Sequence, residues 1–314
     1  ATLYDLYYQT GRTDFIPEII PRAEKILQYF ENQRGENGAI GFDERFWLFE
    51  DWGDLPKKPY PAFLNLWHCH VLTLWRELLS LCGKNTAEVD AKIESEKTLL
   101  RKLFYDPEQQ LMMPVLDRDG KPQGIPIVHD QVLALMLDLV PEAKENMLAK
   151  RIVPCLKGTL REGLQPGAFW STYLLDLAQK LDLRQDALNY IRTHWKHMIP
   201  TSTTWEVFDR GNYPGWSFSH AWSAHPLTHI PELLCGIVQL EPGWRKIRFA
   251  PLTTADVSHA SIAIPVPTGL LKAGFRKEDD GFIGRLEIPQ GMSAEIHTSA
   301  GIRMLTSGEW DFSL

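Results

Sequence analysis

The stretch "PAFLNLWHCHVLTLWRELLSLC", residues 61–82, is apolar on nearly every face of a helix. A helix of this composition is covered on all sides in a folded protein. The next stretch, residues 86–104, also has helical spacing but is far more charged, with Asn85 or Thr86 as its N-cap and Glu88 in its first turn. Together the two stretches predict a buried helix paired with an outer helix that faces water.

This pairing of an apolar helix with a more polar one recurs along the chain. The recurring pairs are 127–140 with 142–157, and 168–181 with 184–199. A final apolar helix is predicted over residues 220–237. Because no heptad repeat is sustained, a coiled coil is excluded, and the irregular starts of the apolar helices disfavour short tandem repeats. We therefore expect a mostly α protein in which residues 1–237 are almost wholly helical and form an α/α toroid, whole or partial.

The hydrophobic pattern changes to a two-residue alternation after residue 238. Segments such as "SIAIPVP", "LLKAGF" and "FIGRLEIP" are separated by the turn signals "EDDG" and "PQG" at hairpin distances. Short alternating strands of this kind pack into two layers. Residues 238–314 are therefore predicted to form a small antiparallel β-sandwich, as a second domain after residues 1–237.

The composition limits the classes of partner. Of 314 residues, 44% are hydrophobic and 23% charged, which is typical of globular proteins. The net charge is −7 and no Lys/Arg run occurs, so we expect neither nucleic acid nor an anionic membrane surface as a partner. No stretch approaches the roughly 20 apolar residues that span a bilayer. The first residues lack the basic and apolar regions of a signal peptide.

The four cysteines lie far apart on apolar helical backgrounds, without a CxxC pair or zinc-ligand spacing. We expect free thiols that fill the core, no disulfide and no metal. The cysteines do not fix the compartment; a periplasmic or secreted location is favoured over a cytoplasmic one. The cysteines are Cys69, Cys82, Cys155 and Cys235.

Titratable and aromatic residues are concentrated in "TTWEVFDRGNYPGWSFSHAWSAHP", residues 203–226. Glu206 follows Trp205, and a carboxylate in an aromatic cleft can take a proton from water; a salt bridge or a helix cap is the alternative role. His220 and Trp222 would project from the first turn of the helix predicted there, with Ser219 as N-cap. There they would meet a sugar's hydroxyls and its apolar face, or else pack in the core.

A second acidic and aromatic stretch, "GFDERFWLFEDWGDLP", occupies residues 41–56 and contains Asp51 and Trp52. It precedes the apolar helix at 61–82, so both stretches fall at equivalent positions on the rim of the expected ring. The pairs His129–Asp130 and Phe169–Trp170 likewise introduce apolar helices. The spacing of the carboxylates does not match an EF-hand. These segments together predict the wall of a central cleft with the composition of a carbohydrate site.

The motifs "TTWEVF", "SFSHAWSAHP" and "GIVQLEPGWRKIRFAP" resemble the bacterial α-L-rhamnosidase type of glycoside hydrolase. The resemblance implies a six-hairpin (α/α)6 barrel followed by a β-sandwich, with Glu206 as general base. "FEDWGD" resembles a family segment associated with the sugar pocket. The family's general acid lies in a D-x-x-x-x-E-R-x-G-W-x-G-D motif that this sequence lacks. The chain thus resembles the later part of such an enzyme, and the acid either lies outside it or comes from the cluster between Glu44 and Asp54.

Three functions follow from these features. The first is an inverting glycoside hydrolase that acts on a rhamnose-containing oligosaccharide or glycoside without a cofactor. The second is a carbohydrate-binding fragment without turnover, and the third is a polysaccharide lyase that uses Tyr213 and His220. The oligomeric state stays open. In the first reading the sugar ring is held by Asp51, Trp52, Trp205, His220 and Trp222.

Overall fold

The computed structural model describes residues 1–209, 211, 215–253, 256–279, 281–298 and 300–314. The chain divides into two compact units, and each is described by itself. The helical unit comprises residues 14–177 and 193–223. The sheet unit comprises residues 1–13, 178–192 and 224–314.

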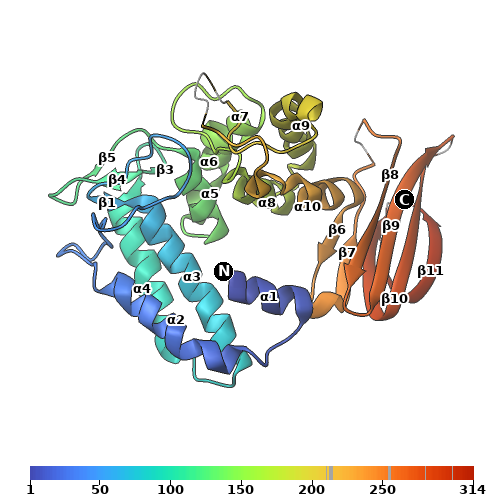
Figure 1. The fold of residues 1–314 in the computed structure, drawn as a ribbon, viewed down its shortest axis with the longest axis horizontal. Helices are drawn as coiled ribbons and strands as arrows, with labels where there is room; N and C mark the ends of the chain where they lie inside the picture. Colours follow the sequence, from blue (N-terminus) through green and yellow to red (C-terminus); the bar gives the residue numbers. More distant parts are fainter. Residues whose placement is uncertain (210, 212–214, 254–255, 280, 299) are drawn as a thin grey trace. The chain divides into compact units, whose positions relative to one another are not determined.

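The helical unit contains the predicted pair of a buried and an outer helix. α3 (Ala62–Leu81) is buried on several faces, whereas α4 (Ala87–Phe104) buries a single stripe. α2 (Ile16–Glu31) lies beside them, as Figure 1 shows. Glu31 of α2 pairs with Lys92 of α4 at 2.7 Å and lies 3.1 Å from the ring of His68 of α3. The prediction from residues 61–104 is therefore confirmed.

The next helices follow the predicted order with an irregular turn. α5 (Val128–Met136) has its first seven residues buried. The polar partner consists of η1 (Pro141–Ala143), α6 (Lys144–Met147), the π-helical turn η2 (Leu148–Ile152) and α7 (Val153–Leu156). Pro154 has no N–H to give to the carbonyl of Lys150. The Arg151 guanidinium donates to that carbonyl instead, at 3.0 Å.

The predicted helix over residues 220–237 is wrong. α8 (Ser171–Lys180), α9 (Arg184–Trp195) and η3 (Lys196–Thr201) are present, but the last segment is broken. It comprises η4 (Ala221–Ser223), α10 (Pro226–Ile230) and the π-helical turn η5 (Pro231–Cys235). Pro226 starts α10 because proline fits the first helical position, and Pro231 interrupts its hydrogen bonds. His220, Trp222 and Ser219 therefore precede the helix.

Short strands are a further difference from the almost wholly helical region that the sequence predicts. β1 (Tyr60–Pro61) pairs with β4 (Val115–Leu116), which pairs with β5 (Pro122–Gln123), and β2 (Tyr105–Asp106) pairs with β3 (Leu111–Met112). The strands are two residues long, so a pattern of alternating hydrophobicity has no room to develop in them.

The described part of the sheet unit has one six-stranded sheet. Its order is β6 (Ile237–Gln239), β7 (Lys246–Phe249), β10 (Gly281–Thr298), β9 (Gly269–Glu278) and β8 (His259–Val266), with β11 (Gly301–Ser313) on the other edge of β10. All pairs are antiparallel except β7 with β10. The predicted antiparallel sandwich is thus replaced by a single sheet with one parallel pair.

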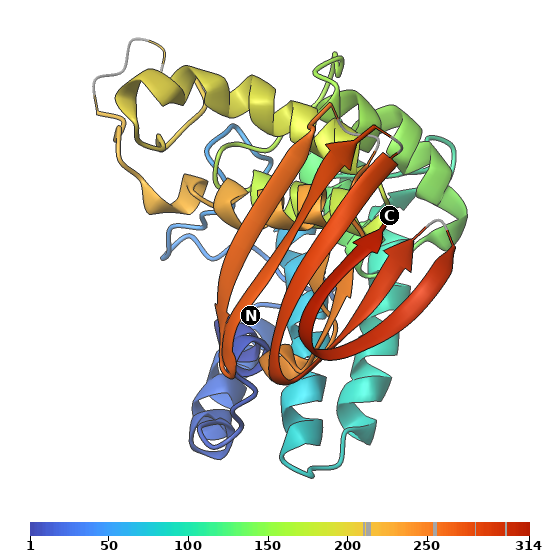
Figure 2. The same cartoon turned by 90° about the vertical axis from the view of Figure 1, so that its right-hand side faces the viewer.

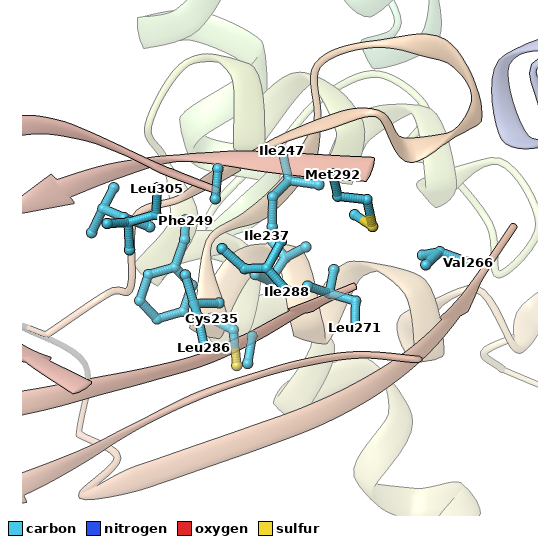
Figure 3. Close-up of a cluster of buried hydrophobic side chains, with 13 residues drawn as sticks. Cys235, Ile237, Ile247, Phe249, Val266, Leu271, Leu286, Ile288, Met292 and Leu305 are labelled. Atoms are coloured by element: carbon cyan, nitrogen blue, oxygen red, sulfur yellow. The ribbon is translucent and has the colours of Figure 1, made fainter. Parts of the chain in front are cut away.

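The bend in β10 explains this difference. Its register with β11 shifts between Ile288 and Ser293. The first part of β10 pairs with β9 and the last part with β7, so one strand serves two arms of the sheet. Figure 2 shows the resulting curl. The arms enclose a hydrophobic core with Phe249, Leu271 and Leu286 (Figure 3).

The first helix, α1 (Thr2–Thr10), belongs to the sheet unit. The Tyr8 hydroxyl donates to the backbone oxygen of Gln239 at 3.0 Å, and the Trp244 indole donates to Gln9 at 2.9 Å. All four cysteines lie in the described part of the chain and are free. Among the described residues, no helix combines the length and apolarity that crossing a membrane requires.

Candidate functional site

Five aromatic rings of the helical unit form a continuous contact set, which we call the aromatic cluster. Phe49 stacks on Trp222 with ring centroids 5.6 Å apart and an interplanar angle of 6°. Trp52 packs edge-on against Trp216 at 5.0 Å and against Trp222 at 6.5 Å. Phe169 touches Phe49 and Trp222. Trp52 is 36% exposed, so the cluster has a solvent-accessible surface. Rings with accessible faces suit the C–H face of a sugar.

His220 lies directly on this cluster. Its ring is 4.0 Å from that of Trp222, and its Nδ1 is buried without a hydrogen-bond partner among the described residues. The backbone around it is fixed by two bonds: His220 N–H donates to the Thr204 carbonyl at 2.8 Å, and the Thr204 hydroxyl donates to the His220 carbonyl at 2.8 Å. The backbone at His220 therefore has a set position, and the ring packs on Trp222 with its Nδ1 directed into the protein.

Glu206 is tied to the aromatic cluster through its backbone. The Trp222 indole N–H donates to the Glu206 carbonyl at 3.0 Å. Ser217 N–H donates to Oε2 of the Glu206 carboxylate at 3.0 Å, and Glu206 N–H donates to the Ser217 carbonyl at 3.0 Å. The side chain is half-buried. These bonds hold a carboxylate beside the segment that carries Trp222 and His220.

Asp51 is buried and fully engaged inside the protein. Its side chain is 1% exposed, and Oδ2 lies 2.9 Å from Nε2 of His129. Gly167 N–H donates to Oδ2 at 2.6 Å, and Trp52 N–H donates to Oδ1 at 2.8 Å. Gly167 is required by this approach, because an added Cβ would lie 2.7 Å from Oδ1. Asp51 thus fixes the backbone that presents Trp52, instead of facing a ligand itself.

Glu50 is anchored by different partners. Its Oε1 accepts the indole N–H of Trp67 at 2.8 Å and also that of Trp170. Burial raises the pKa of Glu50 to about 7, against the opposing effect of the two indole hydrogen bonds. Asp130 is completely buried, and neither of its carboxylate oxygens has a hydrogen-bond partner among the described residues. Burial, and secondarily the charge of Glu50, raise the pKa of Asp130 well above its usual value.

The other predicted residues lie in different surroundings. The Trp205 ring lies 5.0 Å from His197 and 5.3 Å from Phe218, and its indole N–H donates to Thr201. Glu44 is exposed and paired with Lys58, which lowers the Glu44 pKa and disfavours a role as proton donor. Tyr213, the proposed partner of His220 in a lyase, lies outside the described residues.

The structure thus brings Trp52, Trp222, His220 and the backbone of Glu206 into one contact set. It also shows specific partners for Glu50, which was predicted only as a member of the acidic cluster, and for Gly167, which had no predicted role. Glu50 was one of several acids in residues 41–56, and no local pattern distinguishes it. Gly167 carried no signal, because its function depends on Asp51, 116 residues away in the chain.

Among the residues that the structure describes, one group combines side chains of the types that bind metal ions. Glu31, His68 and Glu96 place ligand atoms within 4.8 Å of one another. However, Lys92 pairs with Glu31 at 2.7 Å, and Arg34 pairs with both carboxylates. Two cations already balance the two carboxylates, so the electrostatics disfavour a divalent ion here.

Comparisons with known proteins point to one kind of enzyme. Residues 236–307 match the bacterial alpha-L-rhamnosidase C-terminal domain. The chain is 22% identical over 326 residues to an alpha-L-rhamnosidase of Alteromonas sp., and 23% identical over 318 residues to one of Formosa agariphila. Each alignment covers 93% of this chain, which spans about a third of the length of these relatives.

Solved structures extend the likeness to the fold. The family GH78 rhamnosidase of Bacillus sp. GL1 superposes with a TM-score of 0.76 at 21% identity, covering 87% of this chain and 30% of that one. The Streptomyces avermitilis alpha-L-rhamnosidase, solved with L-rhamnose, gives 0.76 at 16% identity, covering 98% and 32%. The chain therefore has the fold of about a third of a bacterial alpha-L-rhamnosidase.

Proposed function

We propose that this chain forms the sugar-binding wall, and carries the general base, of a glycoside hydrolase of the α-L-rhamnosidase type. Its substrate is a rhamnose-containing oligosaccharide or glycoside. The observation that carries the proposal is the position of Trp222, whose ring belongs to the aromatic cluster while its indole N–H holds the Glu206 backbone. The similarity to named rhamnosidases supports the same assignment. We further propose that the helical unit is part of an α/α toroid.

In this proposal Glu206 activates water. Inverting hydrolysis uses two carboxyl groups roughly 6.5–9.5 Å apart, one to protonate the leaving oxygen and one to accept a proton from the attacking water. Glu206 is half-buried, and the Ser217 N–H bond occupies Oε2. That bond leaves Oε1 to accept the proton as the water oxygen bonds to the anomeric carbon.

The other site residues hold and orient the sugar. Trp52 and Trp222 offer ring faces to the apolar side of the pyranose, and His220 binds a hydroxyl through Nε2, because its Nδ1 is buried. Asp51 acts as a positioning residue through its bonds to His129, Gly167 and the Trp52 backbone. Trp205 has a supporting role in the segment that carries Glu206, because its indole is bonded to Thr201.

Whether the chain contains a proton donor decides whether it is a hydrolase by itself or a fragment that only binds sugar. Within residues 41–56, Glu50 has the raised pKa that an acid requires, but it is 8% exposed and accepts two indole N–H groups. These restraints favour an anchoring role for Glu50. We therefore expect the chain by itself to bind sugar weakly and to turn it over little or not at all.

A calorimetric titration with L-rhamnose tests the binding wall. Trp222→Leu should weaken binding by about tenfold, because it removes a ring face from the site. Trp310→Leu, which changes a tryptophan on β11 in the sheet unit, is the matched control and should leave the affinity unchanged. Equal affinity of the Trp222 variant and the parent chain would exclude the aromatic cluster as the sugar site.

Hydrolysis of an aryl α-L-rhamnoside tests the base. Glu206→Gln keeps an oxygen for the Ser217 N–H, so L-rhamnose affinity should stay within about threefold. Any turnover should fall by roughly 10²–10⁴-fold. Turnover of the Gln variant within a few-fold of the parent would remove Glu206 from the mechanism. Strong hydrolysis by the parent would place the proton donor within residues 1–314, and binding without hydrolysis would favour the sugar-binding fragment.

A further inference from the structure

A pocket of the helical unit adjoins the aromatic cluster. It has a volume of about 370 Å³, within the roughly 300–1,000 Å³ range of small-molecule sites. Two of its aromatic side chains are strongly exposed, Phe46 at 59% and Trp47 at 73%. Its other lining residues include Tyr29, Gln33, Asp43 and Leu64.

Trp47 lines the pocket and also contacts the aromatic cluster. It lines the pocket, and its ring also lies 5.2 Å from Phe49 and 5.9 Å from Trp52. A ligand made of two linked rings can therefore contact Trp52 with one ring and Trp47 with the other. On the far side, Phe46 packs edge-on against Tyr29 at 5.8 Å, which gives the pocket a second aromatic surface.

The polar groups of the pocket indicate which ligand fits. The Asp43 carboxylate accepts hydrogen bonds from Arg45 at 2.7 Å and from the Tyr29 hydroxyl at 2.7 Å. These bonds hold the pKa of Asp43 well below its usual range, so it is ionised at neutral pH. The Arg45 guanidinium balances the charge of this carboxylate, and both of its oxygens already accept hydrogen bonds, so the pocket has no net charge for an ionic ligand and has a polar wall that disfavours an aliphatic chain. The Gln33 amide adds a donor and an acceptor.

We propose that this pocket is a second carbohydrate-ring subsite, which holds the neutral sugar linked to the rhamnosyl residue bound at the aromatic cluster. The inference rests on the proposed function and adds the location of the ring that the reaction releases. Aromatic faces contact the C–H side of that ring, Gln33 binds its hydroxyls, and Asp43 holds the Tyr29 hydroxyl in the wall of the pocket.

The test compares one-ring and two-ring ligands on the 314-residue chain by isothermal titration calorimetry. The ligands are L-rhamnose and an α-L-rhamnosyl-D-glucose whose bridging sulfur resists hydrolysis. The disaccharide should bind about tenfold more tightly than L-rhamnose. Phe46→Ala and Gln33→Ala should each weaken disaccharide binding by about three- to tenfold and leave L-rhamnose binding unchanged.

Ile26→Ala is the matched control, because Ile26 is an exposed apolar residue of α2 that does not line the pocket. It should alter neither affinity. The subsite is excluded if the disaccharide binds no more tightly than L-rhamnose, if the Phe46 and Gln33 variants bind it normally, or if they weaken both ligands equally. L-Rhamnose binding in these cases leaves the proposed function intact, whereas loss of binding of both sugars to the parent chain refutes the two proposals together.

Discussion

The buried carboxyl of Glu50 makes the stability of the protein depend on pH. Burial raises its pKa from 4.5 to about 7, so the folded protein keeps a proton over a range in which the unfolded chain releases it. Each pKa unit corresponds to about 1.4 kcal/mol, and the shift therefore amounts to about 3 kcal/mol. The sign follows from the raised value: the contribution of Glu50 is most favourable below about pH 4.5 and is lost as the pH rises through 7.

Glu50→Gln removes this titration and keeps an acceptor oxygen for the indoles of Trp67 and Trp170. The free energy of unfolding of the variant should equal that of the parent within about 1 kcal/mol near pH 4.5. At pH 8 the variant should be more stable by about 2–3 kcal/mol, because the parent then holds a buried charge. Asp130 titrates in both proteins, but the charge of Glu50 raises the Asp130 pKa only in the parent, so this repulsion adds to the advantage of the variant at high pH.

Urea denaturation at several pH values between 4.5 and 8, followed by tryptophan fluorescence, measures the difference. Glu24→Gln, an exposed substitution on α2, is the control and should give a small difference that does not grow with pH. A difference between the Glu50 variant and the parent that is constant across the range would refute the buried-acid explanation. A variant less stable at pH 8 than the parent would show that the ionised carboxylate is favoured instead.

Three further experiments test other features of the structure. Gly236→Ala should destabilise the sheet unit by about 2–4 kcal/mol in urea denaturation, because its φ is +62° and an added Cβ meets the Ala250 carbonyl; a change below about 1 kcal/mol would contradict this. Thiol labelling of the folded protein should modify Cys82 first, since it is half-buried, whereas Cys69, Cys155 and Cys235 are buried and burial raises the pKa of Cys69 and Cys155 to about 12; rapid labelling of all four would show that the core opens. Gly167→Ala should both weaken L-rhamnose binding and lower the free energy of unfolding, because the new Cβ displaces Asp51. An unchanged affinity in calorimetry would show that Asp51 does not position the binding site.

The helices that the sequence predicts well are those whose burial is visible in their own composition. α3 and α4 differ in charge, and that difference alone separates the buried helix from the outer one. The segment 220–237 has the apolar content of a buried helix, which is why a single helix was predicted there. Pro226 and Pro231 divide it into short helical turns. The bend of β10 arises from pairing with β7 and β9, which a local alternation of residues does not reveal.

The candidate site could be located from sequence in its segments but not in its individual roles. Residues 41–56 and 203–226 were identified by their acids and aromatics, and they supply most of the aromatic cluster. The role of Asp51 could not be foreseen, because its partners His129 and Gly167 are 78 and 116 residues away. The structure buries the Asp51 carboxylate against these distant partners, and the positioning role that we propose for it rests on that burial.

Within residues 49–52, the two acidic side chains hold the loop in place and the two aromatic side chains belong to the aromatic cluster. Glu50 accepts hydrogen bonds from Trp67 and Trp170. Asp51 is bonded to His129 and Gly167 instead. The flanking rings of Phe49 and Trp52 make no such polar tie through their side chains among the described contacts. The hydrogen bonds that hold this loop therefore do not involve either ring. If the aromatic cluster binds a sugar, as we propose, an exchange of the ring at position 49 or 52 would alter the sugar contacts and leave these hydrogen bonds unchanged.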